Sequence, residues 1–162
     1  MLTLAILIYA VAMTLANLSV ATWGPAVTPI NAFVLVGLDL VLRDLLHTRL
    51  RVWQMGALIV ATGALTYLLN PAAGMIAVAS SVAFTAAALV DWATFAKLRG
   101  SWLCRANGSN VAGAAVDSLL FPTIAFGVLM PGIVAAQFVA KVAGGALWAA
   151  LLERVVIPKA RA

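Results

Sequence analysis

The stretch that decides the fold runs from Val90 to Lys141 and reads VDWATFAKLRGSWLCRANGSNVAGAAVDSLLFPTIAFGVLMPGIVAAQFVAK. Two carboxylates, Asp91 and Asp117, lie in apolar runs on either side of a short basic segment, and Lys141 lies within the next apolar run. A charged side chain in hydrocarbon costs at least ~2.5 kcal/mol, so such residues are paired, functional or both. We therefore expect the rest of the chain to form walls around these buried charges.

Composition places the chain among membrane proteins. Its 162 residues are 65% hydrophobic and only 9% charged, whereas a soluble domain carries about 25% charged residues. The length corresponds to one domain. We expect a single transmembrane domain over residues 1–162, with the lipid bilayer as its surroundings.

Six segments approach the roughly 20 apolar residues that a spanning helix needs. They cover about 2–21, 30–47, 52–69, 72–96, 109–129 and 132–157. The first has no charged residue before it, so it is interpreted as a retained span and not a cleaved signal. The pattern predicts an all-α, compact bundle of six transmembrane helices.

Basic residues predict the orientation of this bundle. They gather at the second connection, at the fourth connection and at the C-terminal end, whereas the other three connections carry no charge. The positive-inside rule then places both termini in the cytoplasm, and we expect the chain to lie in the cell inner membrane. Because topology accounts for the net charge of +5, no nucleic-acid partner is expected.

Small residues repeat every fourth position in the fourth span, at Ala79, Ala83 and Ala87. In lipid such a ridge lets two helices approach closely. Packing within the bundle is one interpretation. The other interpretation is that the ridge docks another subunit, which could be a second copy of this chain in a homo-oligomer.

Helical rise brings two opposite charges to the same depth. Asp117 lies about 12 Å along the fifth span and Lys141 about 15 Å along the sixth, counted from opposite membrane faces at 1.5 Å per residue. Both positions fall near the middle of a core roughly 30 Å thick. The two helices could pair these side chains, either to fix helix register or as part of a ligand site.

Other polar residues share faces with this pair. Asn110, Asp117 and Phe121 follow one face of the fifth span, and Gln137 shares a face with Lys141. A carboxylate beside amides and aromatic rings suits a planar, nitrogen-rich ring, since the polar groups complement its edge and the rings stack on its face. The same residue types would also suit a proton relay.

Two further groups lie nearer the expected cytoplasmic side. Asp39 and Arg43 are one helical turn apart and can neutralise each other, with Asp44 adjacent. Asp91 lies about 9 Å from the end of its span, where Arg99 or Arg105 could be its structural partner.

Enzymatic, metal and cofactor chemistry are not indicated. The single cysteine, Cys104, and the single histidine, His47, lack the spacing of a metal site or a catalytic pair. No glycine-rich loop ending in Lys-Ser/Thr is present to hold nucleotide phosphates. We expect no enzyme, no catalytic residue, no metal and no cofactor.

These positions also resemble a known family. The resemblance is carried by Val90-Asp91-x3-Phe95-x2-Leu98-Arg99, Trp102-x2-Arg105-x-Asn107-x-Ser109, Asp117-x3-Phe121-x3-Ala125-Phe126-Gly127 and Lys141. Upstream, Leu38-Asp39-x4-Asp44 is similar to a Thr-Asp-x4-Glu stretch of that family. The family is VUT, the queuosine-precursor transporters, and the similarity extends over roughly residues 35–158.

The resemblance implies import of 7-cyano- or 7-aminomethyl-7-deazaguanine, or of queuine, by a fold similar to the substrate-binding subunits of energy-coupling-factor transporters. It implies that Asp39, Asp91, Asp117 and Lys141 are buried polar positions. Asn110 lies next to Ser109, the serine of the family motif. Leu38 occupies the position of the family's threonine, and Asp44 occupies the position of its glutamate. These differences affect the expected substrate more than the expected fold.

We therefore expect a 7-deazaguanine site between the second, fourth, fifth and sixth spans. Asp117 and Asn110 would read the base edge, Lys141 would keep Asp117 charged, and Phe121 or Phe126 would stack. The remaining expected site residues are Asp39, Asp91 and Gln137. Three alternatives stay open: a binding subunit that needs a separate ATP-driven module, a non-transporting membrane assembly protein, and a proton channel.

Overall fold

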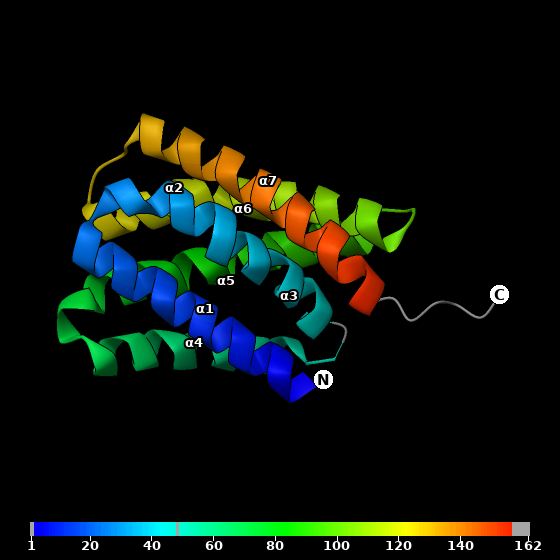
Figure 1. Ribbon diagram of the computed structural model, residues 1–162, viewed down its shortest axis with the longest axis horizontal. Helices are drawn as coiled ribbons and strands as arrows, with labels where there is room; N and C mark the ends of the chain where they lie inside the picture. The colour runs from blue at the N-terminus through cyan, green and yellow to red at the C-terminus, as the bar shows by residue number, and fades with distance from the viewer. Residues whose placement is uncertain (1, 48, 157–162) are drawn as a thin grey trace.

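A computed structural model describes residues 2–47 and 49–156, and every regular element in these ranges is helical. Figure 1 shows the helices lying side by side along one axis. Their bounds are α1 Leu2–Trp23, η1 Pro25–Val27, α2 Thr28–Asn31, η2 Ala32–Val36, α3 Gly37–His47, α4 Val52–Leu69, η3 Pro71–Ala73, α5 Gly74–Lys97, α6 Trp102–Phe126 and α7 Pro131–Val156.

Six of these helical runs are long and apolar enough to cross a membrane, which confirms the predicted fold class. The second of them is continuous from Pro25 to Leu46 through η1, α2, η2 and α3. In Figure 1 the start of α1 and the end of α7 lie at the same end of the bundle. We call this the basic end, because the α3–α4 and α5–α6 connections with Arg49, Arg51 and Arg99 also lie there.

Two helices start earlier than expected. The second span begins at Pro25 and not near residue 30, since proline suits the first turn of a helix, where its missing N–H is not needed. The fifth begins at Trp102 and not near residue 109, because the Ser101 side chain caps it by accepting a hydrogen bond from the Cys104 backbone N–H at 3.2 Å. Arg105 therefore lies on a helix and not in a loop.

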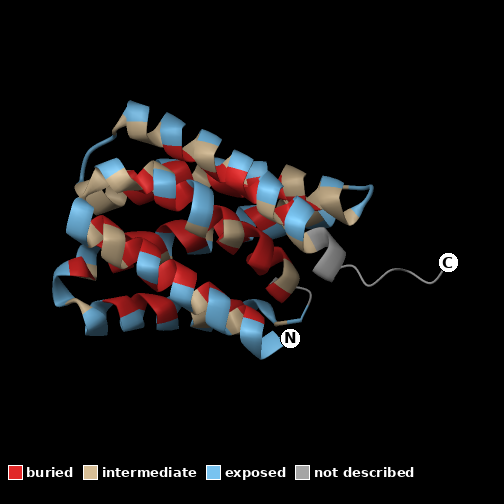
Figure 2. Ribbon diagram, viewed as in Figure 1, coloured by how far each residue is buried: buried red, intermediate tan, exposed pale blue. Residues whose placement is uncertain are grey.

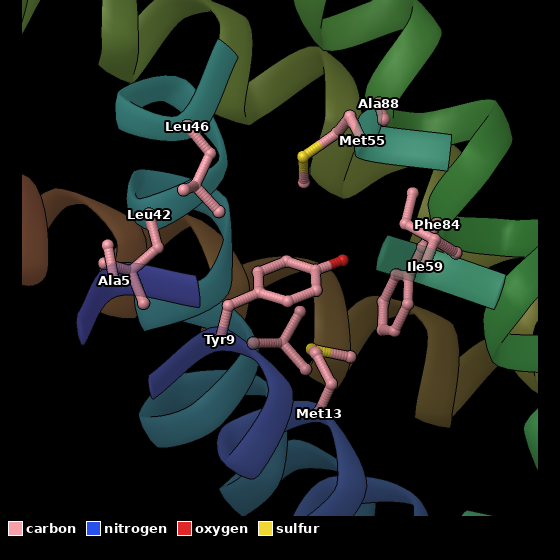
Figure 3. Packing of buried hydrophobic residues seen from close by; sticks show 10 residues of the cluster. Ala5, Tyr9, Met13, Leu42, Leu46, Met55, Ile59, Phe84 and Ala88 are labelled. Atoms are coloured by element: carbon pink, nitrogen blue, oxygen red, sulfur yellow. The ribbon is translucent and has the colours of Figure 1, made fainter. Parts of the chain in front are cut away.

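The outer surface of the bundle is apolar, and the buried residues face inward (Figure 2). Large side chains such as Leu4, Val11 and Leu68 are exposed, as expected of a surface that faces lipid. Inside, Figure 3 shows Tyr9, Met13 and Phe84 packed with neighbouring apolar side chains from α3 and α4.

The alanine ridge of α5 is used within the bundle. Ala79, Ala83 and Ala87 are all completely buried. Ala79 and Ala83 pack with Phe121 of α6, and a Cβ placed on Gly113 of α6 would lie 3.4 Å from the Ala87 carbonyl oxygen. The ridge is therefore not available as a docking surface for another subunit, and that interpretation was wrong.

The second span and α7 touch through their backbones. A Cβ placed on Gly37 would lie 2.7 Å from the carbonyl carbon of Gly144, so neither position has room for a side chain. The contact adjoins the π-helical segment Ala32–Val36, where the Trp148 indole N–H donates to the Val34 carbonyl at 3.0 Å. π-helical segments occur often at functional sites, and this one borders the cavity described next.

Candidate functional site

A cavity with an empty volume of about 300 Å³ lies in the half of the bundle away from the basic end. Residues from α1, the second span, α5, α6 and α7 line it. The polar residues of the lining are Asn17, Thr28, Asn31, Ser80, Asp117, Gln137 and Lys141. Its empty space is divided into narrow gaps between these side chains, so a ligand needs some of them to move.

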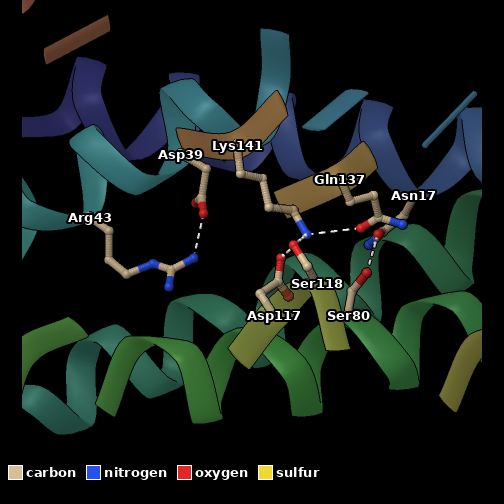
Figure 4. A network of polar contacts seen from close by, with 8 residues as sticks. All are labelled: Asn17, Asp39, Arg43, Ser80, Asp117, Ser118, Gln137 and Lys141. Atoms are coloured by element: carbon tan, nitrogen blue, oxygen red, sulfur yellow. Dashed lines mark hydrogen bonds and ion pairs between the residues drawn. The ribbon is translucent and has the colours of Figure 1, made fainter. Parts of the chain in front are cut away.

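Lys141 is the fixed charge of this cavity (Figure 4). Its Nζ lies 2.7 Å from Asp117 Oδ2, 2.9 Å from Gln137 Oε1 and 3.2 Å from Ser118 Oγ. An ammonium group has three donors, and these three acceptors use all of them. The expected pairing of Asp117 with Lys141 is confirmed, while the role of the pair in binding stays a prediction.

This arrangement leaves two polar atoms of the lining residues free. A lysine can only donate, so the Gln137 amide turns its oxygen toward Lys141 and its Nε2 away. Among the described residues, neither Gln137 Nε2 nor Asp117 Oδ1 has a hydrogen-bond partner. The cavity residues therefore offer one unused donor and one unused acceptor.

A second polar network, which was not predicted from the sequence, also borders the cavity. Asn17 Nδ2 donates to Thr66 Oγ1 at 3.3 Å, and the Ser80 hydroxyl donates to Asn17 Oδ1. Asn31 Nδ2 donates to the Ser19 hydroxyl oxygen at 2.6 Å. An asparagine in the middle of an apolar span was the available signal for Asn17, because in lipid such a side chain needs a partner on another helix.

The two predicted stacking residues are not equivalent. Phe121 lines the cavity, whereas Phe126 does not and meets the Phe121 ring edge-on with centroids 6.4 Å apart. Phe84, which was not predicted, lines the cavity from α5. The aromatic walls are therefore Phe121 and Phe84, and Phe126 supports Phe121 from behind.

Three predicted site residues lie outside the cavity lining. Asn110 is buried beside Gly145, and its amide has no partner among the described residues. Asp39 forms the expected ion pair with Arg43 one turn away. Asp91 is completely buried nearer the basic end.

Of the two arginines expected as partners of Asp91, Arg99 and Arg105, the second is engaged elsewhere. Arg105 donates from Nε and Nη2 to the Phe95 carbonyl at 3.2 and 3.0 Å, and its guanidinium lies 4.0 Å from the Phe95 ring centroid. Among the described residues Asp91 makes no ion pair, and neither of its carboxylate oxygens has a hydrogen-bond partner.

The chemistry of the cavity is that of recognition. It combines one fixed ion pair, one free acceptor, one free donor and aromatic walls inside an apolar bundle. No group of three or more His, Cys, Asp or Glu side chains in the described ranges is arranged to hold a metal ion. Six spanning helices around such an internal site define a multi-pass membrane transporter.

Comparison with known proteins agrees with this class. The sequence matches the family described as "Putative vitamin uptake transporter" over residues 3–158, and the chain belongs to that family. No curated protein and no solved structure matches the chain.

Proposed function

We propose that this protein imports 7-deazaguanine bases, the precursors of queuosine, across the cell inner membrane for tRNA modification. The coarser function, membrane transport in a family named for vitamin uptake, follows from the family. Support for the finer one comes from the cavity and from the motif positions Asp117, Phe121 and Lys141, which resemble those of queuosine-precursor transporters.

The observation that carries the proposal is the pair of free polar atoms on Asp117 and Gln137. A guanine-like edge presents ring and exocyclic N–H donors next to a carbonyl oxygen. Asp117 Oδ1 would accept from the N–H groups, and Gln137 Nε2 would donate to the carbonyl. An adenine-like edge also satisfies the Gln137 donor through a ring nitrogen, but it offers the Asp117 carboxylate one N–H donor where a guanine-like edge offers two.

The walls of the cavity suit a small flat ligand, although the narrow gaps between the lining side chains mean that some of them must move to admit it. Phe121 and Phe84 supply aromatic walls for the face of a bicyclic base.

The alternatives are less well supported. A binding subunit driven by a separate ATPase module would need a docking surface other than the buried Ala79, Ala83 and Ala87 ridge. An assembly protein whose buried charges were all structural would have no need of a polar cavity. Transport by the purified chain in liposomes would exclude a required external module, and it would also exclude an assembly role.

A ligand panel tests the proposal. Thermal shifts of the purified protein in detergent should be largest with 7-deazaguanine bases and guanine, and small with adenine, because a ligand that binds only the native state raises its apparent stability. Asp117→Asn should weaken binding by roughly 10- to 150-fold, the equivalent of the ~1.5–3 kcal/mol of a hydrogen bond to a charged group.

Asn110→Ala is the matched control, since Asn110 is a buried polar residue of the same helix but lies outside the cavity lining. It should bind the base like the wild type. Equal affinity of the wild type and Asp117→Asn would remove Asp117 from the site, and a shift with adenine as large as with guanine would refute the edge recognition.

A further inference from the structure

The buried charges of the described spans do not balance. Four carboxylates, at Asp39, Asp44, Asp91 and Asp117, accompany only two buried cations, Arg43 and Lys141. Arg43 pairs with Asp39 and Lys141 with Asp117, although Arg43 Nε and Nη1 have no hydrogen-bond partner among the described residues. Asp44 and Asp91 form no ion pair among the described residues, although they are 2% and 0% exposed.

These two carboxyl groups lie together. Asp44 is on α3 and Asp91 on the adjacent α5, and they are close enough for a direct hydrogen bond between the side chains. Among the described residues, Asp44 Oδ2 and both oxygens of Asp91 have no other hydrogen-bond partner. A carboxylate cannot donate, so that hydrogen bond exists only when one of the two groups carries a proton.

Helix α6 packs directly against Asp91. A Cβ placed on Gly113 would lie 3.2 Å from the Asp91 Cβ, so the α6 backbone closes directly over Asp91. The charged groups whose field reaches the pair are Arg43 and Asp39 on α3 and Arg105 on α6. Arg43 is paired with Asp39, and Arg105 donates to the Phe95 carbonyl.

We propose that Asp44 and Asp91 hold one proton between them and that this proton is co-transported with the substrate. Two adjacent carboxylates in a site of low dielectric constant cannot both ionise at acceptable cost. A metal ion is disfavoured as the occupant, since no group of three or more suitable ligands occurs in the described part of the chain. The site is separate from the cavity, and it lies nearer the basic end.

Electrostatics connects the proton to the substrate cavity. Asp91 acts on the Asp39–Arg43 pair, and that pair also interacts with Asp117 and Lys141. In addition, the Arg43 guanidinium lies 5.5 Å from the ring centroid of Phe84, which lines the cavity. Protonation therefore changes the field in which the substrate binds, and this coupling is reciprocal.

The step is a simple proton transfer. A carboxylate oxygen of the pair takes a proton from a hydronium ion on the outer side, so one O–H bond of hydronium breaks as the carboxyl O–H bond forms. The carboxyl O–H bond breaks when the proton passes to water on the cytoplasmic side, which forms hydronium there. The base and the proton move inward together, and no other bond changes.

Infrared spectroscopy tests the proton site without any substrate. The wild type at neutral pH should show the C=O stretch of a buried protonated carboxylic acid, and Asp91→Asn and Asp44→Asn should each lose it, because the remaining carboxylate is then free to ionise. Asp117→Asn is the control, and it should keep the band, since Asp117 is paired with Lys141. Absence of the band in the wild type would overturn the proposal, whatever the variants do.

Transport tests the coupling, which rests on the proposed function. In proteoliposomes, an inward gradient of one pH unit should drive accumulation of 7-cyano-7-deazaguanine up to about tenfold, the limit for one proton per substrate. This base is uncharged, so only the proton carries charge. Asp91→Asn should lose accumulation but still exchange external for internal base.

The outcomes separate the two proposals. Accumulation driven by a sodium gradient, or equal accumulation by wild type and Asp91→Asn, would overturn proton coupling. No uptake or binding of the base, together with a band that depends on Asp44 and Asp91, would refute the substrate and retain the proton site.

Discussion

Replacing Lys141 by methionine tests the central ion pair. The change keeps most of the apolar stem but removes the cation that contacts Asp117 at 2.7 Å. The two side chains are only 2% and 3% exposed, so neither water nor salt can screen the charge that is left on Asp117. Breaking a buried pair in this way costs roughly 3–5 kcal/mol.

We expect a loss near the lower end of that range, about 3 kcal/mol, because a membrane protein unfolded in detergent also finds polar partners. Unfolding of the detergent-solubilised protein by increasing denaturant, followed by circular dichroism, measures it. Combining Lys141→Met with Asp117→Asn should restore much of the stability, since the double variant carries no unpaired charge.

The exposed Lys97 at the end of α5 provides the matched control. Lys97→Met should change stability by no more than about 0.5 kcal/mol. If the losses from Lys141→Met and Asp117→Asn simply add in the double variant, the two side chains do not interact energetically and the reasoning is refuted.

Two further predictions concern helix contacts. Gly144→Ala should lower the free energy of unfolding by about 1–3 kcal/mol, because its Cβ would strike the Phe33 backbone. Gly132→Ala is the control and should leave the free energy of unfolding unchanged, since Gly132 has open space around it. Equal effects of the two variants in a denaturation series would contradict the close helix contact. Ala83→Leu should destabilise the isolated chain by a similar amount, since Ala83 is fully buried. Val82→Leu on the exposed side of α5 is its control, and an unchanged midpoint for Ala83→Leu would show that the ridge is free after all.

Features that depend on position along a helix were predictable from the sequence. Asp39 and Arg43 pair because residues four apart share a helix face. Asp117 and Lys141 meet because they lie at similar distances along α6 and α7 from the connection that joins these two helices. The existence of six spans followed from segment length and hydrophobicity.

Features that depend on rotation about a helix axis were not predictable. The spans are apolar on nearly all sides, so no polar face indicates which residues point toward which neighbour. Asn110 was therefore assigned to the cavity, and Asn17 was not. The Asp44–Asp91 contact was missed for the same reason, since it joins helices that are not consecutive in the chain.

The sequence by itself determined that the chain is a bundle of six apolar helices with a few charges held inside it, because the cost of placing charge in hydrocarbon depends on residue type and depth alone. Only the tertiary structure decided which residues line the cavity and that Asp44 lies beside Asp91. Backbone contacts such as Gly37 against Gly144, which need the absence of side chains on both helices, set how the helices are rotated and spaced. That packing leaves Asp117 and Lys141 as a neutral pair in the cavity and Asp44 and Asp91 as a carboxyl pair without a cation.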